Sequence, residues 1–292
     1  MTDGKQVFVY FKSGTLAALD FDGKVLWKTD LQARYGKDTL WWDLGTSPVL
    51  AGGRLVIATL HEGDSYVVAL DPANGEEIWK VARDYPCREE SGQSYATPVV
   101  TEADGRTVVL VWGAAYLTGH DVATGEALWA CGGFNPDNKA NWRDIASPAF
   151  AEGVAVVPYG REQFLAGVKT GGSGDITATA RLWERRGVGT DSATPVAVGG
   201  RAYVVNFKGR VWCLDLKSGE ELWAAALPAG RGMFYSSPIL AGDTLYFCRE
   251  EGSVYVGRVT PSGLELLNET RFDDIFVSTP RSEEPRVGKE CR

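Results

Sequence analysis

The stretch Cys213-Leu-Asp-Leu-Lys-Ser-Gly-Glu-Glu-Leu-Trp223 decides the fold, because it recurs as Ala69-Leu-Asp-Pro-Ala-Asn-Gly-Glu-Glu-Ile-Trp79 and as Gly119-His-Asp-Val-Ala-Thr-Gly-Glu-Ala-Leu-Trp129. Each copy ends on a tryptophan four residues after a glycine. The closing tryptophans are Trp27, Trp79, Trp129, Trp183 and Trp223, with Leu267 in the sixth place. Periods of about 40 to 54 residues without a helical pattern indicate a radially repeated β-architecture.

A Ser-Pro or Thr-Pro pair opens each repeat. The prolines are Pro48, Pro98, Pro148, Pro195, Pro238 and Pro280. Proline suits the first residue of an innermost strand, because its missing N–H costs no ladder hydrogen bond there. The sequence therefore predicts an all-β fold, a β-propeller of four-stranded antiparallel blades with six outer hairpins visible.

The repeat from residue 46 to 80 shows how one blade is built. We expect strands at 47–50, 54–59, 66–70 and 76–79, joined by turns rich in glycine. Asp71 can accept hydrogen bonds from turn N–H groups, and Gly75 supplies a positive φ. A recurring tryptophan needs a partner that also recurs, so we expect the five tryptophans to pack against neighbouring blades as structural docking residues.

Both ends of the chain interrupt the repeat. Residues 281–292 resemble the translation of a sequencing-library adapter, and Met1–Tyr10 aligns with the second strand of a repeat. We therefore assign residues 1–280 to a partial propeller and residues 281–292 to an artefactual or disordered tail. The expected whole is a seven- or eight-bladed propeller of which this is a gene fragment, and a targeting signal would lie upstream.

Composition limits the function. The chain has 292 residues, 44% of them apolar, and a net charge of −8, which argues against a nucleic-acid-binding surface. Its apolar runs are strand-sized, so the sequence predicts no transmembrane segment. Cys87, Cys131, Cys213 and Cys248 form no CxxC pair, and no metal site is predicted from their spacing.

No catalytic motif is recognisable. His61 and His120 are the only histidines, and both positions favour structural roles. The segment Gly171-Gly-Ser-Gly-Asp175 is rich in glycine, but we expect it to form a loop that precedes a strand, which argues against a phosphate site. We predict no catalytic residues.

The segments that lead into the Ser/Thr-Pro strands are the best candidates for a binding surface, because these strands surround the central channel and their entry loops converge on one mouth. Aromatic residues beside Arg and Asp are typical of interfaces. The candidates are Trp41, Trp42, Asp43, Tyr95, Trp142, Arg143, Asp144, Asp191, Arg231, Tyr235 and Asp274. A structural alternative is that Trp42 and Trp142 only plug the channel.

The three quoted copies resemble the Ala-x-Asp-x-x-Thr-Gly-x-x-x-Trp docking repeat of the quinoprotein-like β-propellers. Among them the chain is most similar to bacterial PQQ-binding-like propeller proteins related to the outer-membrane assembly factor BamB. This resemblance implies a non-enzymatic, periplasmic or otherwise extracytoplasmic scaffold without a cofactor. Its expected partner is a protein or a small polar ligand at one propeller face.

Two other functions stay open at this point. A fragment of a PQQ-dependent dehydrogenase would bind PQQ and calcium, and enzymes of that type add a Cys-Cys pair that this sequence lacks. A sensor ectodomain of a membrane kinase would be revealed by a kinase domain and a membrane span upstream. The sequence identifies neither the ligand nor the oligomeric state.

Overall fold

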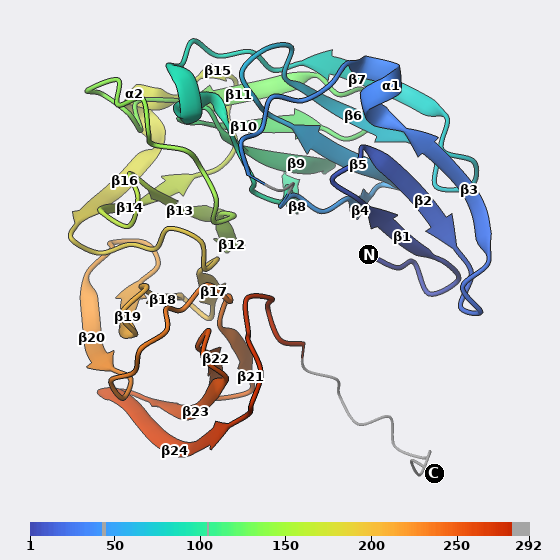
Figure 1. Cartoon of the computed structure of the whole chain (residues 1–292). Helices are drawn as coiled ribbons and strands as arrows, with labels where there is room; N and C mark the ends of the chain where they lie inside the picture. Colours follow the sequence, from blue (N-terminus) through green and yellow to red (C-terminus); the bar gives the residue numbers. More distant parts are fainter. Residues whose placement is uncertain (43–44, 104, 282–292) are drawn as a thin grey trace.

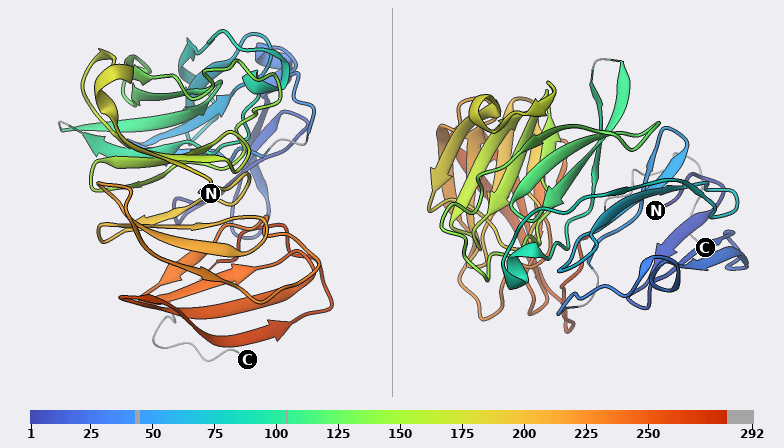
Figure 2. Two further views of the ribbon diagram at one scale, coloured as in Figure 1. Left: turned by 90° about the vertical axis from the view of Figure 1, so that its left-hand side faces the viewer. Right: turned by 90° about the horizontal axis from the view of Figure 1, so that it is seen from above.

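The structure is a computed structural model that describes residues 1–42, 45–103 and 105–281; the predicted tail from residue 282 onward lies outside the described residues. Six β-sheets follow one another along the chain and stand side by side in an arc, with the first sheet and the last sheet at its two ends (Figure 1). The views in Figure 2 show the same order. This arrangement confirms the prediction of an all-β propeller.

We number the sheets as blades 1 to 6. Blade 1 has three strands, and blades 2 and 3 have four meandering strands each, with one strand added to blade 3. The strands are β1 (Val7–Tyr10), β2 (Thr15–Leu19) and β3 (Val25–Asp30); β4 (Val49–Ala51), β5 (Arg54–Thr59), β6 (Tyr66–Leu70) and β7 (Glu77–Ala82); β8 (Val99–Ala103), β9 (Arg106–Gly113), β10 (Tyr116–Asp121) and β11 (Ala127–Cys131).

Blades 4 to 6 repeat the four-stranded pattern. Their strands are β12 (Ala149–Ala151), β13 (Val154–Tyr159), β14 (Phe164–Lys169) and β16 (Arg181–Arg186); β17 (Val196–Val198), β18 (Arg201–Val205), β19 (Arg210–Asp215) and β20 (Glu221–Ala226); β21 (Ile239–Ala241), β22 (Thr244–Cys248), β23 (Ser253–Thr260) and β24 (Gly263–Arg271). The short helical segments are α1 (Leu31–Tyr35), η1 (Glu89–Gly92) and α2 (Thr177–Ala180). No helix in the described ranges has the length and apolar character that crossing a bilayer requires.

Three tryptophans lie against the turn of the next blade. The indole Nε1 of Trp79 donates to the carbonyl oxygen of Val122 at 2.9 Å, and a Cβ on Gly125 would lie only 2.6 Å from the indole ring. Trp27 donates in the same way to Pro72 at 2.8 Å, and Trp183 to Leu216 at 2.9 Å. Glycine is therefore required in this turn for two reasons: the backbone has a positive φ, and the indole ring leaves no room for a Cβ.

Trp223 departs from this pattern for a visible reason. In the next blade, β23 and β24 stay paired as far as Thr260 and Gly263, so the turn that joins them is short. This blade lacks the longer turn whose carbonyl accepts the indole N–H of Trp79. The Trp223 indole nitrogen is enclosed and has no hydrogen-bond partner among the described residues. Its ring stays buried, 6% exposed, in a cluster with Val259 and Leu264.

This difference gives a matched pair of variants. Trp79→Phe removes a donor from the buried Val122 carbonyl, whereas Trp223→Phe removes an indole N–H that has no acceptor. Both lose similar ring volume, so we expect Trp79→Phe to lower the free energy of unfolding by about 1–3 kcal/mol more than Trp223→Phe. Urea denaturation measures both. Equal losses would show that the indole hydrogen bond contributes nothing.

A second link joins the blades at the channel. In blades 3 to 6, and at Thr279 after blade 6, the residue before the proline accepts at its hydroxyl oxygen the backbone N–H of the equivalent residue one repeat earlier. The bonds run from Ser47 to Thr97 at 3.1 Å, Thr97 to Ser147 at 2.9 Å, Ser147 to Thr194 at 3.1 Å, Thr194 to Ser237 at 2.9 Å and Ser237 to Thr279 at 3.3 Å. We call these six residues the hydroxyl belt. It explains why a serine or threonine, and not only a proline, recurs at this position.

Removing one hydroxyl of the belt should destabilise the fold. Thr194→Val keeps the shape of the side chain but leaves the Ser147 N–H without its acceptor, which should cost about 1–3 kcal/mol. Ser13→Ala, at an exposed hydroxyl in blade 1, should change stability by less than about 0.5 kcal/mol. Thermal or urea unfolding of the two variants compares them. A Thr194→Val protein as stable as the wild type would refute a structural role of the belt.

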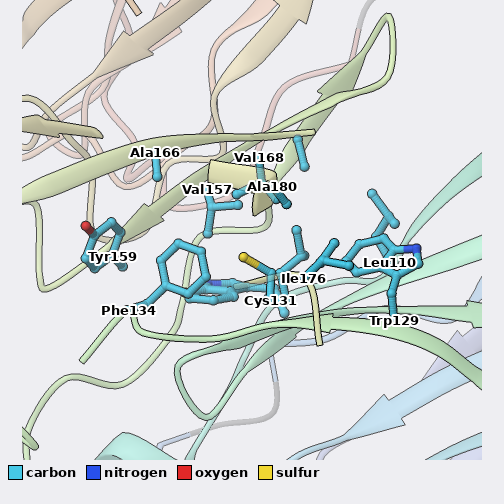
Figure 3. Close-up of a cluster of buried hydrophobic side chains, with 14 of the residues drawn as sticks. Leu110, Trp129, Cys131, Phe134, Val157, Tyr159, Ala166, Val168, Ile176 and Ala180 are labelled. Atoms are coloured by element: carbon cyan, nitrogen blue, oxygen red, sulfur yellow. The ribbon is translucent and has the colours of Figure 1, made fainter. Parts of the chain in front are cut away.

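The core consists of clusters between adjacent blades. Figure 3 shows the cluster shared by blades 3 and 4, where Leu110 and Trp129 of blade 3 face Val157, Ala166 and other apolar residues of blade 4. Alternate residues of each middle strand point into such clusters, and most are less than 2% exposed. Burying both faces of every sheet fixes the register of the strands.

The glycine-rich segment differs from its prediction. Gly174–Asp175 forms β15, which pairs in parallel with Trp129 and Ala130 of β11, and the short helix α2 follows it. Ile176 is buried between blades 3 and 4. The expected loop before a strand was therefore wrong, because the apolar Ile176 draws the insertion back onto the neighbouring sheet (Figure 1).

Candidate functional site

The entry segments of several blades enclose one groove. A cavity of about 670 Å³ lies between them. Its lining includes the predicted residues Trp42, Tyr95, Arg143, Asp191 and Tyr235, together with Arg161, Phe207, Glu250 and Val277. We call this cavity the mouth groove. Since its walls come from connections far apart in the sequence, the propeller fold is what assembles it.

A buried ion cluster forms one wall of the mouth groove. Arg143 Nη1 lies 2.8 Å from Glu90 Oε1, and Arg143 Nη2 lies 3.9 Å from Asp191 Oδ2. The guanidinium also lies 5.7 Å from the ring centre of Trp42, whose indole donates to Glu90 at 3.2 Å. One arginine thus links the entry segments of blades 2, 3, 4 and 5.

This cluster is incompletely satisfied. The Asp191 side chain is 6% exposed, and its carboxylate has the 3.9 Å contact with Arg143 but no hydrogen bond within the described residues. Burial raises the pKa of Asp191, while Arg143 and Arg161 act in the opposite direction. The Arg143 Nε is enclosed and has no acceptor among the described residues. Of these two residues, Asp191 lines the groove with a carboxylate that can accept a hydrogen bond there.

Aromatic rings form the rest of the wall. The Tyr95 hydroxyl accepts the backbone N–H of Trp42 at 3.2 Å and donates to Gln93 Oε1 at 2.8 Å. Across the groove, Phe207 and Tyr235 pack edge to face with ring centres 5.2 Å apart. Rings fixed in this way offer contact area at little entropic cost.

A turn with an uncommon backbone conformation contributes the positive charge of Arg161 to the mouth groove. Arg161 and Glu162 have φ angles of 56° and 74°, an uncommon conformation for residues with side chains. Glu162 accepts the Phe207 N–H at 2.9 Å, which holds the turn, and burial raises the pKa of Glu162. Arg161 lines the mouth groove and is exposed. Such conformations cost energy and persist where the surroundings fix them.

Some predicted residues lie elsewhere. Trp142 does not line the groove, since its ring is buried against Tyr159 and Phe164 in the blade 3–4 cluster. Trp41 is 58% exposed and is not part of the groove lining, and Asp274 lines a separate cavity with Phe272. Arg231 is exposed and is not part of the groove lining, and Asp43 lies outside the described residues.

Asp144 is buried behind the groove. Its Oδ2 accepts the backbone N–H of Ala115 at 3.3 Å. Burial raises the pKa of Asp144 to about 8, although the Ala115 N–H and Arg83 act in the opposite direction. The carboxyl is therefore a structural acceptor between blades 3 and 4.

Asp144 should make stability depend on pH. The folded carboxyl keeps its proton up to about pH 8, whereas an unfolded aspartate releases it near pH 4, so the folded state loses stability as pH rises through this window. Asp144→Asn keeps an acceptor for Ala115 and removes this titration. We expect its stability relative to the wild type to increase from about pH 4 to about pH 8 in denaturant unfolding. Asp137→Asn, at an exposed site, should follow the wild type, and a wild-type profile for Asp144→Asn would contradict the assignment.

The two histidines differ in environment. His120 is buried, Nε2 lies 3.0 Å from Thr118 Oγ1, and burial lowers its pKa to about 4. It therefore stays neutral and structural. His61 accepts the Thr39 N–H at Nδ1, 3.3 Å away, in the β5–β6 turn.

Three residues of the groove escaped the sequence prediction. Glu90 lies in the segment that leads into Pro98, but a single glutamate in a polar segment carries no signal that sets it apart. Arg161 and Phe207 belong to the turns between the second and third strands of their blades, and these turns reach the same mouth. The turn between the second and third strands recurs at the same place in each repeat, so this recurrence could have identified Arg161 and Phe207 as candidates.

The donors of a quinone and calcium site do not come together in the described part of the chain. No group of three or more His, Cys, Asp or Glu side chains there is placed to hold a metal ion. The sequence also has no adjacent cysteines.

Fold and site together define a β-propeller with tryptophan-docked blades and an elaborated channel mouth. The family model described as "Outer membrane protein assembly factor BamB" matches residues 1–225 and 102–260. The chain belongs to this family.

Curated relatives and solved structures agree. Proteins named outer membrane protein assembly factor BamB are 26% identical over 241 residues in Yersinia pestis (75% of this chain, 54% of the relative) and 26% identical over 245 residues in Moranella endobia (80% and 58%). The chain thus spans little more than half the length of these relatives.

BamB from Moraxella catarrhalis superposes with a TM-score of 0.67 at 16% identity, over 94% of this chain and 76% of that one. A europium-containing methanol dehydrogenase gives 0.70 at 11% identity, over 96% and 69%. At these identities the superpositions show the fold alone.

Proposed function

We propose that this chain is the propeller of a non-enzymatic, extracytoplasmic scaffold that binds a partner protein at the mouth groove during outer-membrane protein assembly. The single observation that carries the proposal is the groove itself, in which rings from separate blades surround a buried and incompletely satisfied ion cluster. Family membership supports the assembly role and a periplasmic location.

The chemistry of the groove favours a protein over a small ligand. Aromatic side chains and an arginine at the centre of a surface are typical of the residues that contribute most to protein binding. Trp42, Tyr95, Phe207 and Tyr235 are such anchors, and Asp191 can accept a donor from the partner. Arg161 and Glu250 add one charge of each sign, so a partner with mixed charges fits the groove.

A genetic test can examine both the role in outer-membrane protein assembly and the mouth groove as the binding site. The gene that encodes this chain would be deleted in its own host, and the amounts of outer-membrane β-barrel proteins measured. The deletion is then complemented with the wild type, with Trp42→Ala/Tyr235→Ala, or with Phe11→Ala/Phe21→Ala, which removes two exposed rings from blade 1. We expect the groove variant to fail and the blade 1 variant to restore the barrel proteins, at equal protein levels.

Two outcomes would overturn the proposal in different ways. Unchanged barrel proteins after deletion would refute the assembly role. Full restoration by the groove variant would refute the mouth groove as the binding site, whatever the role of the protein.

A further inference from the structure

The strand β20 forms the outer edge of blade 5, on the rim of the arc (Figure 1). Within the described residues its only bonded strand neighbour is β19, so no strand covers its outward side. The N–H and C=O groups on the outward side of such an edge strand are free to pair with a further strand.

Blade 3 shows what an outer edge of this propeller can bind. Its outer strand β11 is paired in parallel with β15, which belongs to the insertion of blade 4. In this pairing Trp129 lies opposite Gly174, and Ala130 lies opposite Asp175. An extended segment from outside the blade is thus added to an outer strand as one more strand of the sheet.

The equivalent positions on β20 are more exposed. In blade 3 the residue before the tryptophan, Leu128, is half-buried, and Cys131, two residues after the tryptophan, is fully buried. Their counterparts in blade 5 are Leu222, which is 43% exposed, and Ala225, which is half-buried. The edge of β20 is therefore accessible at the place where β15 covers β11.

The residue after the docking tryptophan separates these two edges from the others. It is charged in blades 1, 2 and 4, as Lys28, Lys80 and Glu184, but it is alanine in blades 3 and 5, as Ala130 and Ala224. Charged side chains on an edge strand oppose the addition of another strand. β20 thus has the small, uncharged residue of the edge that accepts a strand, and no strand of the described chain lies on it.

Apolar side chains flank the edge of β20. Leu264 packs in the cluster between blades 5 and 6, and Leu266, two residues further along β24, lies on the same face and is 43% exposed. Leu222 adds an exposed apolar side chain from β20 itself. The carboxylate of Glu221, at the start of β20, lies 3.8 Å from Arg185 and so already has a partner. An uncharged segment with apolar side chains fits this surface.

We propose that the edge of β20 binds an extended, uncharged segment of a partner protein as an added strand. Main-chain groups of the segment would pair with those of β20, as β15 pairs with β11, and its apolar side chains would contact Leu222 and Leu266. A second copy of the chain fits less well, because one six-residue strand from each copy buries far less than the roughly 1,600 Å² of a typical stable interface. The site shares no residue with the lining of the mouth groove, so it does not depend on the proposed function.

The first test uses the full chain labelled with ¹⁵N and a hexapeptide of alternating threonine and valine. We expect the hexapeptide to bind and to give nuclear Overhauser effects between its backbone protons and those of Leu222–Ala226. The same hexapeptide with N-methyl groups on two consecutive central residues loses a donor on each of its edges and should not bind. No binding at millimolar hexapeptide, equal binding of the N-methylated form, or contacts only to other strands would overturn the proposal.

Variants of the chain give the second test, by fluorescence anisotropy of the labelled hexapeptide. Ala224→Lys places a lysine where β3 and β7 already carry one, so the fold accepts it, and it should weaken binding about fivefold or more. Leu222→Lys, which removes an apolar contact, should act in the same direction. Val25→Lys, which adds the same charge to exposed β3, should leave the affinity unchanged.

The groove variant Trp42→Ala/Tyr235→Ala should also bind the hexapeptide with unchanged affinity, so a failure here is separate from a failure of the proposed function. Equal affinity of the wild type, Ala224→Lys and Leu222→Lys would refute the site. A dimer of the wild-type chain that Ala224→Lys dissociates, measured by light scattering, would assign the edge to a second copy and would also refute the proposal.

Discussion

The contact between each blade and the next is the constraint on which the rest of the structure depends. At the outer edge a tryptophan covers the turn of its neighbour, and at the channel a hydroxyl accepts its neighbour's backbone N–H. Both contacts join only adjacent sheets, and so do the apolar clusters. A sheet with two apolar faces cannot be stable alone, so the blades stabilise one another in series.

The mouth groove follows from this arrangement. The hydroxyl belt sets the position of each innermost strand, and the entry segments must then meet above it. Arg143 and Asp191, about one repeat apart in the sequence, come within 3.9 Å for this reason. The curved arrangement of the blades therefore brings together residues that no local sequence pattern connects.

The sequence predicts the fold well because its signals are local and repeated. Pro48, Gly75 and Trp79 each specify a backbone position or a packing contact, and their copies agree. From the sequence, only the segments that form the site could be predicted, not the individual residues. Tyr95 and Asp191 line the groove, whereas the Trp142 ring is buried in the core, because it packs against Tyr159 and Phe164, which lie about 20 residues further along the chain. The hydroxyl belt was missed because serine and threonine before proline also occur for many other reasons.

The short strand β15 has a consequence for solubility. The outer strand of a propeller blade usually presents unpaired N–H and C=O groups, and such edges can recruit strands of other molecules. In blade 3 this edge carries the apolar sequence Ala127-Leu-Trp-Ala-Cys131, and β15 pairs with it at Trp129 and Ala130. The insertion thereby shields the middle of this edge from intermolecular β-pairing, which would otherwise seed aggregation.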